Sequence, residues 1–226
     1  AGGEQAMASK IITALFRPDE FFAEHANEEA ALAVPFGIVF IYSILSAVAG
    51  YQMAALMAPM YDVALEGYGG VIAIFGALGG FFGGIIIWII ASVLFYLLSM
   101  AFHGEGSMKK VLEAVGYGMA PLIAAAGIGI AYLAMVADQV VAPFISDIMD
   151  PAAAEEAVEA FMNQPVMADF TLLQTFLSVV FMIWVANIWY YGIRHARKLT
   201  ARDAGISVII PVAIYLIVVI ASYGVF

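Results

Sequence analysis

Long apolar runs separated by short polar segments dominate the pattern along this chain of 226 residues. A helix needs about 20 apolar residues to cross about 30 Å of hydrocarbon. Five runs meet that requirement, at approximately residues 32–57, 71–102, 111–141, 170–191 and 206–225. The pattern therefore predicts an all-α fold, a polytopic membrane bundle of five transmembrane helices that occupies residues 31–226.

Residues 1–30 are predicted to form a separate segment with an amphipathic helix. One face of that helix is apolar and consists of Ala8, Ile11, Ile12, Leu15 and Phe16. Pro18 ends this helix or begins another, and Phe21 and Phe22 are expected to anchor at the membrane interface. Apolar periodicity leaves two arrangements open, because the helix either lies in the headgroup plane or packs beneath the bundle.

A short acidic helix is predicted before the fourth crossing. Asp150 is expected to cap this helix, Pro151 suits the first helical position, and Pro165 is expected to end it. Its apolar stripe consists of Ala154, Val158, Phe161 and Met162. We expect this helix to rest on the membrane surface or on the bundle.

Composition supports lipid as the solvent of the crossings. The chain is 65% hydrophobic and 12% charged, whereas a soluble domain is about half apolar and about a quarter charged. The chain has no cysteine, which excludes disulfides, thiolate catalysis and Cys-based metal sites. The three histidines, His25, His103 and His195, have no spacing that indicates a metal site.

The basic residues indicate the orientation. All of them fall in three places: Lys10 and Arg17; Lys109 and Lys110; and Arg194, Arg197, Lys198 and Arg202. The intervening loops around residues 58–70 and 143–169 contain neither Lys nor Arg. Because basic flanks are held in the cytoplasm, we expect a cytoplasmic N-terminus and an outside C-terminus in the cell membrane.

A line of glycines in the second crossing predicts close helix packing. Gly76, Gly80 and Gly84 recur every four residues, and Gly50 lies on a similar line of small residues in the first crossing. Such stripes let two helix backbones approach one another. We expect these two stripes to pair within the bundle, and the alternative is a homo-oligomer formed through the same glycines.

The third crossing is expected to bend near its beginning. Pro121 removes one backbone hydrogen bond, and Gly116 precedes it together with Tyr117 and Gly118. Glu113 is predicted to pair with Lys109, one helical turn earlier. A weakened turn of this kind is either a static bend or part of a binding site.

Chemistry within the membrane is not indicated by the midplane residues. No Asp, Glu, Lys, Arg or His falls in the middle of a crossing, whereas proton-coupled transport and intramembrane catalysis require such groups. The predicted binding site is therefore the loop before the third crossing and the bend behind it. Its residues are Gly104, Gly106, Lys109, Lys110, Gly116, Tyr117 and Pro121.

Several segments resemble the Yip-domain family, the Rab-interacting multi-pass membrane proteins. The stretch 102–110 with Gly116-Tyr117 and Pro121 is similar to the family's loop and third crossing. Residues 15–22 are similar to the leader of prokaryotic members. Residues 184–211 are similar to the family's final loop and last helix.

The resemblance implies the five-crossing layout and, in eukaryotes, roles in vesicle trafficking, Rab binding and membrane shaping. The short segment before the bundle is typical of a prokaryotic member and does not favour Rab binding. We expect a non-enzymatic scaffold or adaptor without a cofactor, with membrane lipids and other membrane or cytoplasmic proteins as partners. Nucleic acid is not expected as a partner. The alternative is a channel or transporter for a small solute.

Overall fold

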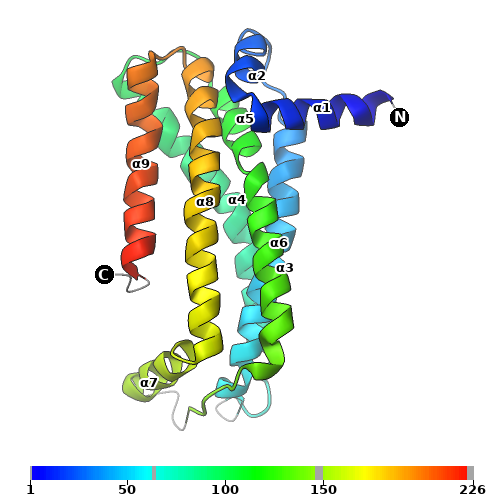
Figure 1. Cartoon of the computed structure of the whole chain (residues 1–226), viewed down its shortest axis with the longest axis vertical. Helices are drawn as coiled ribbons and strands as arrows, with labels where there is room; N and C mark the ends of the chain where they lie inside the picture. Colours follow the sequence, from blue (N-terminus) through cyan, green and yellow to red (C-terminus); the bar gives the residue numbers. More distant parts are fainter. Residues whose placement is uncertain (1, 63–64, 146–149, 223–226) are drawn as a thin grey trace. The chain divides into compact units, whose positions relative to one another are not determined.

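The computed structural model describes residues 2–62, 65–145 and 150–222, and its regular elements are helices (Figure 1). They are α1 (Gly2–Phe16), α2 (Pro18–Glu24), α3 (Ala33–Tyr61), α4 (Val71–Ala101), α5 (Met108–Gly118), α6 (Ala120–Val136), the 3-10 turn η1 (Ala137–Gln139), α7 (Pro151–Met162), α8 (Pro165–Ala196) and α9 (Ala201–Ser222). The expectation of an all-α membrane fold is confirmed.

Among the described residues, five helical stretches are long and apolar enough to cross a membrane. They are Ala33–Tyr61, Val71–Ala101, Met108–Gln139, Pro165–Ala196 and Ala201–Ala221. The fourth begins at Pro165 and ends at Ala196, so it extends beyond the predicted residues 170–191 at both ends. The third is divided at Met119 into α5 and α6, at the bend that Pro121 predicts.

The chain divides into two compact units. Unit 1 consists of Ala1–Tyr42, Gly84–Ala125 and Leu177–Phe226, and unit 2 consists of Ser43–Gly83 and Ala126–Phe176. All Lys and Arg residues of the sequence belong to unit 1. Unit 2 therefore has only acidic ionisable side chains, apart from its tyrosines.

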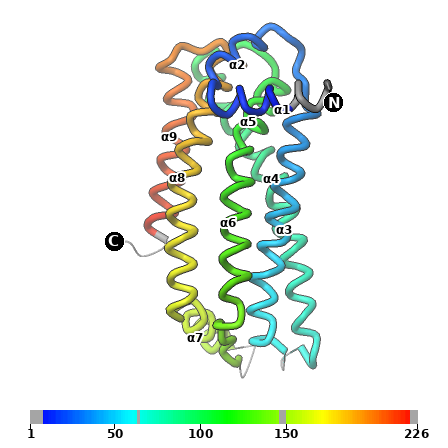
Figure 2. The backbone as a smooth tube through the Cα atoms, turned by 45° about the vertical axis from the view of Figure 1, so that its right-hand side comes forward, coloured from blue at the N-terminus to red at the C-terminus, as the bar shows by residue number. Residues whose placement is uncertain are grey.

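The core of unit 1 gathers around α5. Val111, Val115 and Met119 are completely buried, together with Ile188 and Ile193 of α8. Trp88, Phe95 and Trp189 are large aromatic residues of the same core. The tube in Figure 2 shows α5 beneath α2, and α1 contacts both of these helices.

The α1 helix packs on unit 1 through one side. Ala14 is buried, Ile11 and Leu15 are half-buried, and the indole of Trp184 donates to Leu15 O at 3.0 Å. Ile12 and Phe16 remain 57% and 67% exposed. The five residues predicted to share one face therefore do not share one environment.

The core of unit 2 forms under α7. Phe161 of α7 is buried against Met60, Leu133, Ile145 and Met167. The predicted cap is present, because Asp150 Oδ1 accepts from Ala152 N at 3.0 Å. Of the predicted stripe, Phe161 is buried, Ala154 and Val158 are half-buried, and Met162 is exposed, so α7 packs on protein.

The glycine lines of α3 and α4 meet within unit 2. A Cβ atom on Gly50 would overlap the carbonyl of Gly76, and one on Gly80 would overlap the carbonyl of Ser46. By contrast, a Cβ atom on Gly79 would meet nothing within 4 Å. The stripe of Gly76 and Gly80 is thus occupied by the chain's own α3. Gly84 belongs to unit 1 and is buried there.

Candidate functional site

The predicted site begins at the N-terminus of α5 in unit 1. Ser107 has an extended backbone and caps the helix, with its Oγ accepting from Lys110 N at 3.4 Å. The helix ends at Gly118, where Met119 N donates to Gly116 O at 3.2 Å. Two glycines precede this turn, and Pro121 after it has no N–H to donate.

Two tryptophans approach the backbone of α5 before the break. Trp88 Nε1 donates to Leu112 O at 2.9 Å, and Trp189 Nε1 donates to Val115 O at 3.0 Å. The neighbouring glycines give these indoles their space. A Cβ atom on Gly118 would overlap the Trp189 ring, and one on Gly116 would lie 3.2 Å from Trp88 Nε1.

Tyr117 lies between these glycines and packs on α2. Its ring centroid is 4.9 Å from that of Phe21 and 6.2 Å from that of Phe22, both edge to face. Phe21 and Phe22 are only 3% and 7% exposed. Their prediction as membrane-interface anchors is therefore wrong, because α2 turns both rings into the protein core.

An ion pair within α5 is hydrogen-bonded to the segment after α2. Lys110 Nζ lies 3.1 Å from Glu113 Oε2 and donates to His25 O at 2.9 Å, while Glu113 Oε1 accepts from Ala31 N at 3.3 Å. The predicted partner of Glu113, Lys109, is exposed instead. Positions three and four residues apart share a helix face, and here the chain segment over α5 favours the nearer lysine.

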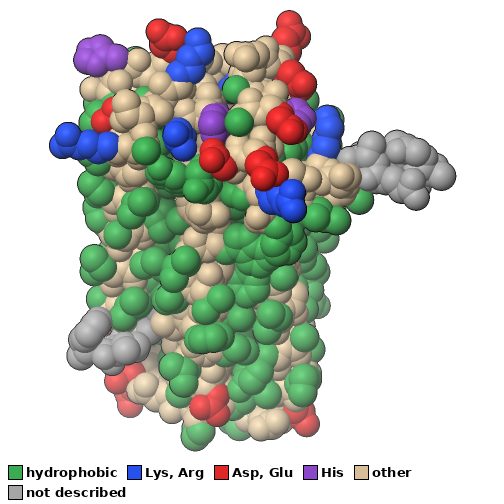
Figure 3. Space-filling model, turned by 45° about the horizontal axis from the view of Figure 1, so that its top comes forward, with side chains coloured by type: hydrophobic (Ala, Val, Ile, Leu, Met, Phe, Trp, Pro, Cys, Tyr) green, Lys and Arg blue, Asp and Glu red, His purple; other side chains and the backbone are tan. Residues whose placement is uncertain are grey.

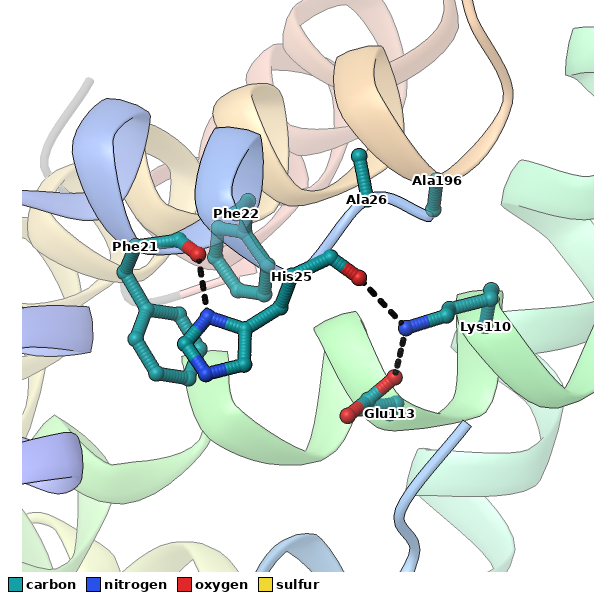
Figure 4. A pocket seen from close by; sticks show the side chains of 7 residues that line it. All are labelled: Phe21, Phe22, His25, Ala26, Lys110, Glu113 and Ala196. Atoms are coloured by element: carbon teal, nitrogen blue, oxygen red, sulfur yellow. Dashed lines mark hydrogen bonds and ion pairs between the residues drawn. The ribbon is translucent and has the colours of Figure 1, made fainter. Parts of the chain in front are cut away.

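A small cavity lies beside this ion pair (Figure 4). Its volume is about 10 Å³, which is about the space that one water molecule needs. Figure 4 shows the Lys110 ammonium group between the His25 carbonyl and the Glu113 carboxylate. The remaining lining residues are Phe21, Phe22, Ala26 and Ala196.

Arg197 joins two loops of unit 1, residues 102–107 and residues 197–200, which we call the clamp loops. Its side chain donates to the carbonyls of Gly104 and Gly106 and, from Nε, to Ser99 Oγ at 2.8 Å. Its guanidinium carbon lies 4.4 Å from the centroid of the Tyr96 ring. Arg197 is only 2% exposed, so its charge is stabilised by carbonyl dipoles and an aromatic face.

The glycines of the loop fit closely around this arginine. Gly106 has a φ of 102°, in the left-handed region that disfavours side chains, and a Cβ atom there would overlap Ala196 O. Glu105 N donates to Arg197 O at 2.9 Å. The backbones of both clamp loops are therefore held in one conformation by the same residue.

Comparison of the sequence with models of protein families shows to which family the chain belongs. The family model of the Yip1 domain matches residues 12–223, which include α2, both clamp loops and the break at Met119. The chain belongs to the Yip1 domain family.

An uncharacterised protein of Methanocaldococcus jannaschii is similar to this Yip1-domain chain. The two are 38% identical over 116 residues, which cover 51% of this chain and 82% of the relative. No solved structure gave a significant match. The similarity to an archaeal protein agrees with a prokaryotic-type member of the Yip1 family.

Polar side chains of this Yip1 domain gather at the end of unit 1 that carries the clamp loops (Figure 3). His103, Lys109 and Arg202 are exposed there. Lys198 and Glu105 form an exposed ion pair at 3.1 Å across the two loops. Among the described residues, no group of three His, Asp or Glu side chains is arranged to hold a metal ion.

The structure does not gather the predicted binding residues into one site. Gly104 and Gly106 contribute carbonyls to Arg197, while Lys110, Gly116 and Tyr117 belong to the buried surroundings of α5. Lys109 is exposed on the surface, and Pro121 lies in the first turn of α6. Of the predicted binding residues, only Lys109 and the exposed surface of the clamp loops are therefore available to a partner.

Sequence reasoning missed the arginine that organises this site. Arg197 appears in the sequence as one of several bases near a helix end, which positive-inside bias explains equally well. The loop that surrounds it gave one signal. Gly104 and Gly106 are two glycines within three residues, which indicates a loop that approaches other backbone closely. Only the folded chain shows that the loop wraps around Arg197.

Proposed function

We propose that this protein is a non-enzymatic scaffold or adaptor of the Yip type, which binds another protein at the exposed surface of the clamp loops. The observation that carries the proposal is the buried Arg197, bonded to Gly104 and Gly106. A surface whose backbone is already ordered loses less conformational entropy when a partner binds. The clamp therefore favours recognition by a preformed surface.

The charges around the clamp indicate what kind of partner fits. Lys109 and Arg202 project from helix starts on either side of the loops, and Lys198 accompanies Glu105. Such a mixed but mainly basic rim attracts an acidic protein surface and makes association faster at low salt. We expect binding to weaken as the ionic strength rises.

The cavity beside Lys110 and Glu113, in the described part of unit 1, is too small for an ordinary small-molecule ligand. The cavity at Lys110 and Glu113 has space for about one water molecule, whereas small-molecule sites commonly measure about 300–1,000 Å³. A surface interaction would use the ordered geometry of the clamp loops without requiring a substrate site. This reasoning supports a scaffold over an enzyme.

The same distribution of bases supports an orientation in the cell membrane. Lys and Arg are retained preferentially on the cytoplasmic side, and all of them lie in unit 1. We therefore propose that the clamp loops and the N-terminus face the cytoplasm and that the C-terminus lies outside. The partner is then a cytoplasmic protein or the cytoplasmic part of a membrane protein.

A channel or transporter is the second candidate, and polar groups in unit 2 favour it. Gln52 Nε2 donates to Ile130 O at 3.4 Å, while its Oε1 is buried without a partner. The amide of Gln174 occupies the space beside Gly129. Uptake of small ions and polar solutes by protein-containing liposomes above that of empty liposomes, abolished by Gln52→Leu, would support this candidate over the scaffold.

Photo-crosslinking in native membranes tests the scaffold directly. A photoreactive side chain at Lys109 or at Ala201 should give protein adducts of defined mass, because both positions are exposed beside the clamp loops. The matched control is Val180, which is 44% exposed on an apolar part of α8. Adducts with lipid alone at Lys109 and Ala201 would contradict the proposal.

A further inference from the structure

The α1 helix has three sides of different character. With 100° of rotation per residue, Ile11, Ala14 and Leu15 share the side that packs on unit 1. Ile12 and Phe16 lie about 130° away from the centre of that side, and Lys10 and Arg17 lie about 130° further round. The helix thus has one side for protein, one apolar exposed side and one basic exposed side.

The apolar side of α1 is mostly exposed in the described structure. Ile12 and Phe16 are 57% and 67% exposed. Phe16 contacts Trp184 of α8 through rings 5.4 Å apart. Two large apolar residues one turn apart, exposed beside a membrane-spanning helix, are stabilised by an apolar environment.

The neighbouring surface of α8 changes character at the level of Trp184. Toward the middle of the helix the exposed side chains within unit 1 are Val180 and Ile183, and beyond Trp184 the next exposed side chain is the amide of Asn187. Tryptophan is enriched where hydrocarbon meets headgroups. Trp184 is also the residue whose indole binds Leu15 O of α1.

We infer that α1 lies in the surface of the membrane that the chain crosses, with lipid as the occupant of its apolar exposed side. Ile12 and Phe16 enter the boundary between headgroups and acyl chains. Lys10 and Arg17 face the phosphate groups and water, where Arg17 also keeps its exposed ion pair with Glu20 at 3.4 Å. The apolar surface of Phe16 then continues into the lipid-facing surface of α8.

This placement gives α1 a role that protein packing alone does not. An amphipathic helix held in one leaflet binds according to its buried apolar area and to anionic headgroups, and it responds to curvature and lipid composition. Because Asp19 of α2 lies 2.6 Å from His195 of α8, α1 is followed directly by a segment fixed to the bundle. A change in lipid composition that alters the membrane binding of α1 can therefore affect the end of unit 1 that carries the clamp loops.

Site-directed spin labelling tests the inference, since the chain has no cysteine of its own. Single Ile12→Cys, Phe16→Cys and Lys10→Cys variants are labelled in liposomes of phosphatidylcholine and phosphatidylglycerol. Collision rates are measured with oxygen, which concentrates in hydrocarbon, and with a water-soluble nickel chelate. Val180→Cys is the lipid control, and Arg202→Cys is the water control.

Labels at Ile12 and Phe16 should give an oxygen-to-nickel ratio at least threefold above that at Lys10, and within twofold of that at Val180. Ratios at both positions equal to that at Arg202 would overturn the inference. Loss of the Phe16 ring affects its contact with Trp184, so the Ile12 label provides the independent reading. A low oxygen-to-nickel ratio at Ile12 together with unchanged thermal unfolding would place this side of α1 in water or on protein.

Discussion

Trp189 Nε1 donates a 3.0 Å hydrogen bond to Val115 O, four residues before the helix break at Met119. At the break, Met119 N donates to Gly116 O, three residues back instead of four. The tryptophan of α8 therefore satisfies a carbonyl at the place where the regular pattern of α5 ends. This relationship explains why a glycine, Gly118, stands against the indole.

Gly118→Ala should destabilise the protein by about 1–3 kcal/mol, the usual cost of forcing atoms into a filled core. Its Cβ atom would overlap the Trp189 ring. The control is Gly127→Ala in α6, where a Cβ atom would meet nothing within 4 Å. There the better helix propensity of alanine should leave stability unchanged or raise it by up to about 1 kcal/mol.

The measurement is the midpoint of thermal unfolding in detergent. Equal midpoints for the two variants would mean that the indole moves aside without cost, and the glycine would then have no packing role.

Two adjacent glycines of α4 offer a second matched comparison. Gly80→Ala should destabilise unit 2, because its Cβ atom would overlap the carbonyl of Ser46 in α3. Gly79→Ala should be tolerated, because the space beside Gly79 is open. The expected difference is again about 1–3 kcal/mol. It is checked by thermal unfolding, and a larger loss in Gly79→Ala would refute the observed pairing of α3 with α4.

Arg197→Lys should cost more than about 2 kcal/mol, although the charge is retained. A lysine has no planar fork with which to reach two carbonyls and a hydroxyl together, and buried carbonyls left without donors are costly. Arg17→Lys is the control, since its side chain is 71% exposed and exposed substitutions usually change stability by less than about 0.5 kcal/mol. Trypsin should also cleave after Lys109 faster in Arg197→Lys than in Arg17→Lys, because the clamp loops are less ordered. Equal cleavage rates in the two variants would argue against the clamp.

The buried ion pair should show measurable coupling in a double-mutant cycle. Lys110→Met and Glu113→Gln each leave a buried partner, and the double variant should lose at least about 1 kcal/mol less than their sum. The exposed pair of Lys198 and Glu105 serves as the reference, with side chains 66% and 71% exposed. Its coupling should stay below about 1 kcal/mol, and a larger value there than at Lys110 would contradict the role given to burial.

The proposed orientation predicts opposite labelling of two introduced cysteines. A membrane-impermeant thiol reagent added to intact cells should label Ala152→Cys in α7 and spare Ala201→Cys at the start of α9. Both positions are exposed, and the basic residues place only the second on the cytoplasmic side. Labelling of Ala201→Cys alone would reverse the topology.

The helical crossings could be predicted because their signal is local. About 20 apolar residues in sequence are sufficient to indicate a span, and Pro121 with its glycines indicated the break at Met119. The failures concern what surrounds a residue. Phe21 and Phe22 are equally apolar whether they meet lipid or protein, so their burial depends on contacts with Tyr117 that no local pattern specifies.

The position of the site in the sequence could be predicted, but the contacts that determine its conformation could not. The loop at Gly104 and Gly106 was identified from its glycines and adjacent lysines, yet its conformation depends on Arg197, which lies 91 residues away from Gly106 in sequence. Likewise, Lys109 and Lys110 have identical chemistry, and only the path of residues 25–31 over α5 determines which one is buried. Long-range contacts of this kind require the folded chain.

The most direct test of the central claim is the effect of the clamp on partner capture in native membranes. With a photoreactive side chain at Ala201, the yield of protein adduct is compared among the parent, Arg197→Lys and Arg17→Lys, at a temperature where all three remain folded. We predict at least a fivefold loss of adduct in Arg197→Lys and no change in Arg17→Lys. An unchanged yield in Arg197→Lys would contradict the claim that the ordered clamp loops form the recognition surface.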